Sequence, residues 1–221
     1  MKPENIDYTL CLVTDRELAR GRPMLDIVEA AVCGGVTCVQ LREKISSTRE
    51  FIEQAIAIRD FLRFRDIPLI INDRLDVALA VGADGVHLGQ NDMLLAMARS
   101  IVKDAMFIGI STNSLEDAVA AEKGGADYLG VGPIYATPTK TDTAPVLGLD
   151  GLEKIRKNVK IPLVTIGGMN HSNTAQVIRK GADGIAVVSA IVAAKDPEKV
   201  SRDLMNTIQL AKTEIGASIQ N

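Results

Sequence analysis

Short apolar runs rich in β-branched residues recur along the whole chain, and each is followed by a longer stretch with helical periodicity. The predicted strands are Tyr8–Thr14, Thr37–Leu41, Leu69–Ile71, Gly85–Leu88, Phe107–Ile110, Tyr128–Val131, Leu163–Ile166 and Gly184–Val188. The predicted helices lie near residues 24–33, 47–65, 74–81, 92–102, 115–123, 149–157, 171–180 and 197–213. Strands that are apolar on both faces are typical of a parallel sheet, and eight strand–helix units predict closure into a barrel.

The alternative architecture is an open, doubly wound sheet, which usually has fewer strands. No glycine-rich dinucleotide motif follows the first strand. A length of 221 residues also suits one parallel barrel. We therefore predict a single (βα)8 TIM-barrel domain over residues 1–221, with flexible ends at about 1–6 and 215–221.

An internal echo supports the barrel, because similar tetrapeptides end a helix and open every second strand. They are Gly34-Gly35-Val36-Thr37, Gly82-Ala83-Asp84-Gly85, Gly125-Ala126-Asp127-Tyr128 and Gly181-Ala182-Asp183-Gly184. Glycine allows a left-handed helix stop, and aspartate can accept hydrogen bonds from the backbone in a tight turn. We assign these turns to stability and expect no catalytic role for them.

Composition indicates which classes of binding partner and which cellular compartment to expect. The formal net charge is −3, aromatic residues make up 3% and tryptophan is absent, so nucleic acid is not an expected partner. No apolar stretch reaches the roughly 20 residues that span a bilayer, and no signal-peptide pattern precedes the first strand. Cys11, Cys33 and Cys38 lack metal-site spacing and are expected to be core thiols. We therefore expect a cytoplasmic protein without a membrane partner.

The predicted strands end in polar or glycine-rich residues, and in parallel barrels the active site lies at these ends. Gly167-Gly168 and Val188-Ser189 follow the seventh and eighth strands, where backbone N–H groups and helix termini can hold a phosphate. A pair of tight turns is the structural alternative for them.

A second set of strand-end residues combines cations with acids: Arg42, Lys44, Asp73, Asp92 and Lys140. Cations and carboxylates that converge on one pocket indicate a metal-bound diphosphate, since Mg²⁺ prefers one or two carboxylates together with phosphate oxygens. Helix capping is the alternative role for each of the two aspartates. The stretch from Gly132 to Gly148 is long for a loop in a compact domain, which indicates a lid or binding loop.

These motifs together resemble the thiamine-phosphate synthase family. The resemblance covers nearly the whole chain, and its motifs are residues 40–44 (QLREK), 72–73 (ND), 87–92 (HLGQND), 132–140 (GPIYATPTK), 167–168 (GG) and 188–189 (VS). It implies the condensation of hydroxymethylpyrimidine diphosphate with thiazole phosphate to give thiamine phosphate and pyrophosphate. These small molecules would be the partners, and Mg²⁺ the cofactor.

The resemblance also implies residue roles, carried over by matching motif. Asp73 and Asp92 would bind Mg²⁺. The pyrimidine diphosphate would be held by Gln40, Leu41, Arg42, Glu43, Lys44, Asn72, Ser111 and Lys140, of which Arg42, Lys44, Ser111 and Lys140 would be catalytic. The thiazole phosphate would be held by Thr137, Pro138, Thr139, Gly168, Val188 and Ser189.

Three other functions stay open at this point: a thiazole tautomerase on a similar barrel, a lyase or isomerase of another phosphate-binding barrel family, and a thiamine-pathway sensor without turnover. A tautomerase would not need the cations and acids assigned to the diphosphate, and a sensor without turnover would not need intact cations and metal ligands. A barrel lyase or isomerase would need a separate acid or base at the barrel mouth. The sequence allows a homo-oligomer without indicating one.

Overall fold

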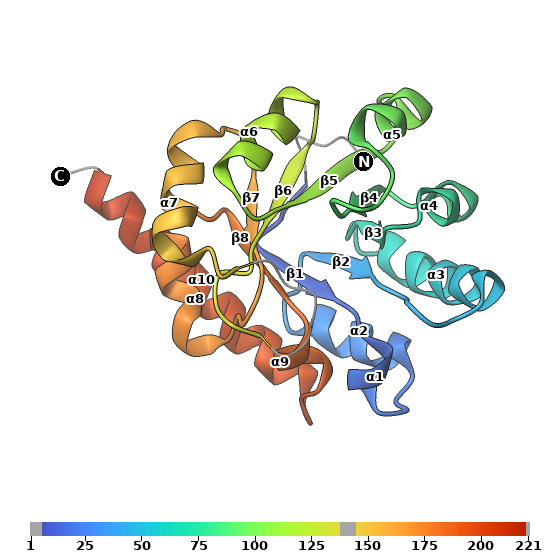
Figure 1. Ribbon diagram of the computed structural model, residues 1–221. Coiled ribbons are helices and arrows are strands. Elements are labelled where there is room, and N and C mark those ends of the chain that lie inside the picture. Colours follow the sequence, from blue (N-terminus) through green and yellow to red (C-terminus); the bar gives the residue numbers. More distant parts are fainter. Residues whose placement is uncertain (1–5, 138–144, 220–221) are drawn as a thin grey trace.

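Eight parallel strands close into a barrel in the order of the chain, as seen in the computed structural model, which describes residues 6–137 and 145–219 (Figure 1). The strands are β1 (Leu10–Val13), β2 (Cys38–Leu41), β3 (Leu69–Asn72), β4 (Gly85–Leu88), β5 (Phe107–Thr112), β6 (Tyr128–Val131), β7 (Leu163–Thr165) and β8 (Gly184–Val187). The first strand pairs with the eighth, so the sheet has no edge and the open-sheet alternative is wrong.

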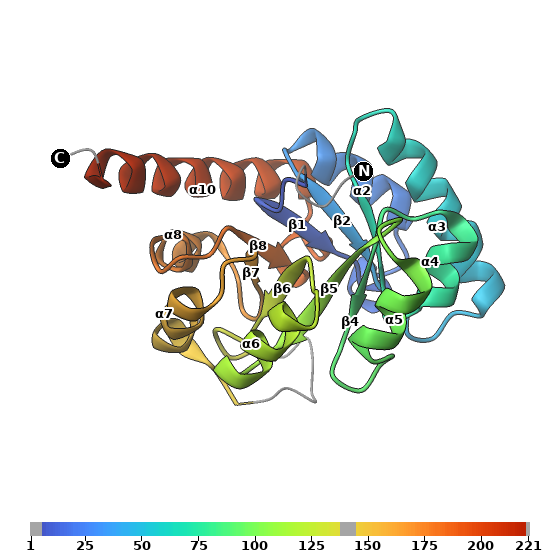
Figure 2. The ribbon, with the colours of Figure 1, turned by 90° about the horizontal axis from the view of Figure 1, so that it is seen from above.

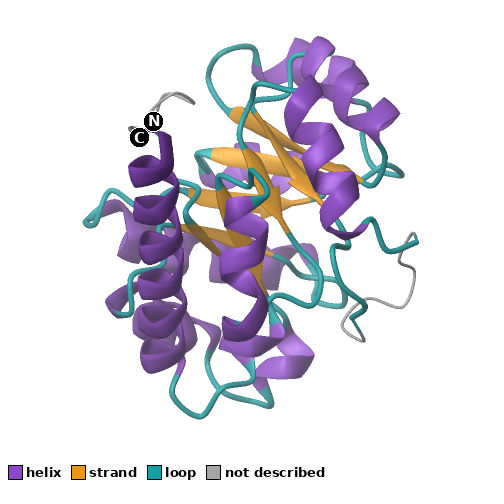
Figure 3. Cartoon of the chain, turned by 90° about the vertical axis from the view of Figure 1, so that its left-hand side faces the viewer, coloured by secondary structure: helices purple, strands orange, loops and turns teal. Residues whose placement is uncertain are grey.

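Helices surround this barrel on its outside (Figure 3). They are α1 (Arg16–Ala19), α2 (Met24–Cys33), α3 (Thr48–Arg63), α4 (Leu75–Val81), α5 (Leu95–Val102), α6 (Leu115–Lys123), α7 (Gly148–Asn158), α8 (His171–Arg179), α9 (Ser189–Val192) and α10 (Pro197–Ile219). The long α10 runs beside α8 and α2 and so joins the last unit of the barrel to the first (Figure 2).

Four helices differ from the sequence-based prediction. Two short helices, α1 and α9, were not predicted, because four residues are too few to show a 3.6-residue period. α10 continues to Ile219, beyond its expected end. α5 begins at Leu95 rather than near residue 92, because the preceding turn closes on the Asp92 carboxylate, which accepts a hydrogen bond from the Gly89 N–H at 2.7 Å.

The echoed turns have a shared structural role at the amino ends of the strands. In each, the side chain just before an even-numbered strand accepts a backbone N–H from the start of the preceding odd-numbered strand. The pairs are Thr37 Oγ1 with Leu10 (3.0 Å), Asp84 Oδ2 with Leu69 (3.0 Å), Asp127 Oδ2 with Ile108 (2.7 Å) and Asp183 Oδ2 with Leu163 (2.7 Å). The turns therefore tie neighbouring strands together at the end away from the proposed site, as a stability role predicts.

Two apolar cores position the strand ends. The larger core lies between the strands and the helices. The smaller fills the barrel interior with Tyr8, Cys11, Val13, Cys38, Ile70, Phe107, Tyr128, Val164 and Ala186. Tyr8 and Tyr128 stack there with ring centroids 4.7 Å apart. The described side chains thus fill the barrel interior below the carboxyl ends of the strands, where active sites of such barrels lie.

Cysteine placement partly corrects the expectation from sequence. Cys11 and Cys38 are buried, whereas Cys33 is exposed, so the prediction of three core thiols is wrong for that residue. Cys33 is the last residue of α2, on a face that turns away from the barrel, whereas Ala31 two residues earlier is fully buried.

In the described parts of the chain, no helix has the length and apolarity that crossing a membrane requires.

Candidate active site at the carboxyl ends of the strands

A cavity of about 370 Å³ opens at the carboxyl ends of the strands. Its lining residues come from all eight strand–loop units, and they include Cys11 of β1. The predicted site residues in its lining are Gln40, Arg42, Asn72, Ser111, Thr137, Gly168, Val188 and Ser189. Residues that are up to 149 positions apart in the chain, Gln40 and Ser189, therefore share one cavity.

Two predicted residues of the β2 segment direct their side chains elsewhere. Leu41 is fully buried in the core between strands and helices. The Glu43 side chain, which is 1% exposed, accepts hydrogen bonds from Arg16 Nε at 2.9 Å and from Ser46 Oγ at 3.0 Å. Side chains alternate between the two faces of a strand, so Gln40 and Arg42 line the cavity while Leu41 and Glu43 do not.

The loop after β6 enters the site with its described part. Gly132, Pro133 and Thr137 line the cavity, and the backbone N–H of Ile134 donates to Ile166 O at 3.0 Å. The other predicted residues of this loop, Pro138, Thr139 and Lys140, lie outside the described residues.

Asp73 and Asp92 form an acidic pair beside Lys44. Lys44 Nζ lies 2.5 Å from Asp73 Oδ2. Burial alone raises the pKa of Asp73, but the hydrogen bonds from Lys44 and Asp92 outweigh it and hold that pKa below its usual value. Burial and the hydrogen bond to Asp73 raise the pKa of Asp92. The pKa of one carboxyl is lowered and that of its neighbour is raised, as expected where two acids interact, and a bound divalent cation would favour the charged form of both.

Neither Asp73 nor Asp92 is the N-cap residue of a helix, so the alternative role of helix capping is not observed for them. The residue at the N-cap position of α4 is Arg74 and that of α5 is Leu94. Asp73 instead adopts a left-handed backbone conformation with φ of 65°, and its N–H donates to His87 O at 2.8 Å. A non-glycine residue in this region of conformational space is uncommon and is found preferentially at functional sites.

A cation held by these two carboxylates would need further ligands. Within residues 6–137 and 145–219, no three His, Cys, Asp or Glu side chains gather in one place. Magnesium usually takes one or two carboxylates and completes its shell with water and substrate phosphate oxygens. The donor set therefore fits Mg²⁺ that arrives with, or is completed by, a phosphate-bearing substrate.

Ser111 is held by a buried polar chain inside the barrel. His87 Nε2 lies 2.8 Å from Ser111 Oγ, and His87 Nδ1 lies 2.8 Å from the hydroxyl of Tyr128. Burial raises the pKa of the Tyr128 hydroxyl well above its usual value. The Ser111 hydroxyl is therefore fixed in direction before any ligand binds.

The opposite side of the cavity is formed by backbone. Gly167 and Gly168 have φ of 98° and 66°. A Cβ atom on Gly168 would lie 2.9 Å from Ala136 O, so only glycine fits the conformation and the space together. Val188 and Ser189 follow β8, and Ser189 opens α9. This side can approach an anion closely without a side-chain cation.

Sequence reasoning missed the end of β1. Thr14 Oγ1 accepts the Arg42 N–H at 2.9 Å, and Asp15 Oδ2 lies 3.0 Å from Arg42 Nη1. Thr14-Asp15-Arg16 directly follows the first strand, so the polar end of this strand is the signal in the sequence that points to it.

Comparison with known proteins assigns the chain to a family. The family model of thiamine monophosphate synthase matches residues 10–191. The thiamine-phosphate synthase of Chloroflexus aurantiacus is 53% identical over 207 residues, covering 94% of this chain and 95% of the relative. That of Albidiferax ferrireducens is 56% identical over 188 residues, covering 85% of this chain and 86% of the relative.

Solved structures agree with this assignment. A thiamine phosphate pyrophosphorylase from Pyrococcus furiosus superposes with a TM-score of 0.87 at 43% identity, covering 93% of this chain and 98% of that one. A 3-hexulose-6-phosphate synthase, at 18% identity and a TM-score of 0.66, shares the fold alone. The sequence match, the shared barrel and the residues gathered at its open end lead to one conclusion: this chain belongs to the thiamine monophosphate synthase family.

Proposed function

We propose that this protein is a transferase that joins hydroxymethylpyrimidine diphosphate to thiazole phosphate, releasing thiamine phosphate and pyrophosphate. Membership of the synthase family supports the reaction. The observation that carries the proposal is the division of one cavity. Arg42 lines its β2–β4 side, the Lys44–Asp73 pair and Asp92 follow the same strands just outside the lining, and glycine-rich backbone lies at its β7–β8 side. A reaction between a diphosphate and a monophosphate needs two such anion-binding regions.

The diphosphate belongs on the β2–β4 side in this proposal. Asp73 and Asp92 would hold Mg²⁺, which when bound supplies positive charge to the diphosphate leaving group. Arg42 and Lys44 add cationic donors, and Lys140 is the third cation that we assign to this task. The side chains of Leu41 and Glu43 are packed away from the cavity. These two residues therefore contribute through their backbone, which positions Arg42 and Lys44.

The pyrimidine ring belongs next to Gln40, Asn72 and Ser111. Its electron-rich ring favours departure of pyrophosphate from the exocyclic methylene carbon, because the positive charge left on that carbon is delocalised. The carbon–oxygen bond to the diphosphate breaks first, and the electron pair leaves with pyrophosphate. Polar groups with fixed direction, such as the Ser111 hydroxyl held by His87, orient the ring without solvent reorganisation.

The thiazole phosphate belongs on the β7–β8 side. Gly168, Val188 and Ser189 would hold its phosphate, and Thr137, Pro138 and Thr139 are assigned to the same substrate. Anchoring the phosphate aims the thiazole nitrogen at the methylene carbon, where its lone pair forms the new carbon–nitrogen bond. Positioning of this kind can supply about 7–11 kcal/mol of the barrier reduction. No proton has to be removed by a side chain, so a nucleophile–base pair is not needed.

The test is release of pyrophosphate, measured with both substrates and Mg²⁺ and then with each component omitted. We expect thiamine phosphate and pyrophosphate in equal amounts, and only when all three are present. Isomerisation of a thiazole substrate without pyrophosphate release would identify a tautomerase. Binding of both substrates without turnover would identify a sensor, and either result would refute the proposal.

We also propose that the reaction takes place in the cytoplasm. Cys11, Cys33 and Cys38 are free thiols, and free thiols persist in a reducing compartment. Fractionation of cells that produce the protein, with detection by an antibody, would test this location.

A further inference from the structure

Arg42 is the cation of the cavity whose guanidinium is held by a carboxylate outside the cavity lining. Arg42 Nη1 lies 3.0 Å from Asp15 Oδ2, and the side chains are 23% and 13% exposed. Lys44, in contrast, is 52% exposed and pairs with Asp73, which we assign to the metal. Asp15 has no place in the cavity lining and none in the proposed chemistry.

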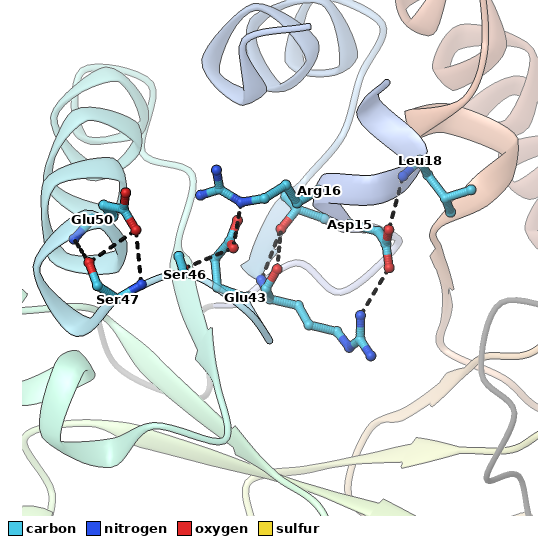
Figure 4. A network of polar contacts seen from close by, with 9 residues as sticks. Asp15, Arg16, Leu18, Glu43, Ser46, Ser47 and Glu50 are labelled. Atoms are coloured by element: carbon cyan, nitrogen blue, oxygen red, sulfur yellow. Dashed lines mark hydrogen bonds and ion pairs between the residues drawn. The ribbon is translucent and has the colours of Figure 1, made fainter. Parts of the chain in front are cut away.

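Asp15 is itself held in place by the helix that it begins. It is the N-cap residue of α1, and its Oδ1 accepts the Leu18 N–H at 3.1 Å (Figure 4). One carboxylate oxygen therefore fixes the residue to α1, and the other meets Arg42. The carboxylate cannot turn away from Arg42 without giving up the cap.

The backbone of Arg42 is fixed from the same strand end. Thr14, which is fully buried, accepts the Arg42 N–H at 2.9 Å through Oγ1 and donates to Arg42 O at 3.3 Å. The Thr14 N–H in turn donates to Gln40 O at 3.0 Å, which extends the β1–β2 ladder. Main chain and side chain of Arg42 are thus both anchored to Thr14-Asp15.

This arrangement matters because a free arginine side chain carries about 2 kcal/mol of rotamer entropy that binding must overcome. An arginine side chain that is already held in one orientation loses less rotamer entropy when an anion binds, so its affinity for the anion is higher. A guanidinium has five N–H donors, so the bond to Asp15 leaves others for phosphate oxygens.

We infer that Asp15 is a positioning residue: it holds the Arg42 guanidinium in the orientation that binds the diphosphate substrate. The inference rests on the proposed function for the identity of the anion, and on the Asp15–Arg42 contact for the mechanism. It adds to the site a residue that acts on substrate only through another side chain.

The test is the Asp15→Asn variant. Asparagine is an equally good N-cap, so α1 should keep its start and the protein should stay folded, with the melting temperature lowered only by the loss of one ion pair. The asparagine amide would turn either its neutral carbonyl oxygen or its NH₂ group toward Arg42. In both cases the charge-assisted bond to the guanidinium is lost. We expect the KM for the pyrimidine diphosphate to rise about tenfold, a change of about 1.4 kcal/mol in binding. The KM for the thiazole phosphate should stay the same.

A double-mutant cycle separates positioning from a general structural effect. In an Arg42→Ala background, Asp15→Asn should change the KM for the pyrimidine diphosphate by less than about twofold, because its only route to substrate is gone. Glu17→Gln, an exposed carboxylate on the same helix, is the matched charge control and should behave like the unmodified protein. The unmodified protein, the two single variants Asp15→Asn and Arg42→Ala, and the double variant are also titrated calorimetrically with Mg²⁺–pyrophosphate, so that binding is measured even where turnover is slow.

Two results would overturn the inference: equal rises in the KM of both substrates, or an equal Asp15→Asn effect with and without Arg42. Absence of turnover in the unmodified protein would refute the proposed function instead. The pyrophosphate titrations would in that case still show whether Asp15 acts through Arg42.

Discussion

At the scale of single residues, the site is prepared before substrate binds. His87 is buried and both of its ring nitrogens are engaged, one by Ser111 and one by Tyr128. Asp73 is held in a left-handed conformation by its own N–H donating to His87 O. One strand, β4, therefore organises a residue assigned to the pyrimidine and a residue assigned to the metal. Such preorganisation is the main way in which an enzyme stabilises developing charge.

The metal assignment is tested at Asp92. In Asp92→Asn we expect kcat/KM for the pyrimidine diphosphate to fall by about 100-fold or more, because the leaving group loses its metal-bound charge compensation. The measurement is steady-state pyrophosphate release at increasing Mg²⁺ concentration. Asp76→Asn, at an exposed carboxylate on α4 that pairs with Arg74, is the control and should keep its activity. Unchanged turnover in Asp92→Asn would remove Asp92 from the metal site.

The monophosphate assignment is tested at Gly168. In Gly168→Ala the new Cβ would meet Ala136 O, and alanine is strained at a φ of 66°. The backbone must shift, so we expect the KM for the thiazole phosphate to rise about tenfold or more while the KM for the pyrimidine diphosphate changes little. Initial rates with each substrate varied in turn give both constants. If the two constants rose together, Gly168 would not belong to one substrate alone.

At the scale of elements, the short turns before the even-numbered strands connect the barrel at its stability face. Asp127 accepts the Ile108 N–H at 2.7 Å and lies 2.5 Å from Arg99 Nη2. Arg99 belongs to α5, so one carboxylate ties a strand, a turn and a helix together. The same geometry recurs at Asp183, with Leu163 and Arg156.

Removal of that carboxylate should destabilise the protein without affecting the chemistry. In Asp127→Ala the Ile108 N–H and the Arg99 guanidinium lose an acceptor, which costs about 1–3 kcal/mol. We expect the melting temperature to fall by about 2–12 °C, with both KM values unchanged. Asp203→Asn breaks an exposed Lys199 pair on α10 and should shift the melting temperature by less than about 2 °C. A specific loss of substrate affinity in Asp127→Ala would contradict the stability role.

At the scale of the whole molecule, the barrel closes around an interior in which aromatic rings face glycines. Gly85 lies against Phe107, Gly109 against Tyr128, and Gly130 against His87. Each ring occupies the space that a neighbouring strand leaves open, which lets eight strands meet around a filled centre. The same filling supports the floor of the cavity, since Tyr128 and Gly130 line it.

One substitution tests this complementarity. In Gly109→Ala the added methyl group would overlap the ring of Tyr128, whose hydroxyl is bound to His87. Overpacking of this kind costs about 1–3 kcal/mol, so the melting temperature should fall by about 2–12 °C. Gly216→Ala places the same methyl group in open space on α10 and should raise stability by about 0.5–1 kcal/mol. Equal effects of the two changes would show that the barrel interior has room to spare.

The sequence by itself determined the succession of strands and helices, because the apolar periodicity and the glycine stops are local signals. It also determined which residue types stand at the strand ends, and in a parallel barrel those ends meet. Gln40, Arg42, Asn72 and Ser111 were found in this way and do line one cavity.

Only the tertiary structure decided which side of a strand faces the cavity and which strand ends support one another. Leu41 and Glu43 stand between cavity residues in the chain, yet their side chains face away, because alternate positions on a strand point to opposite faces and the register selects the face. The Asp15–Arg42 contact joins residues 27 positions apart, and it exists because β1 and β2 are neighbours in the closed barrel. Local patterns carry no information on such contacts, since chain closure in three dimensions creates them.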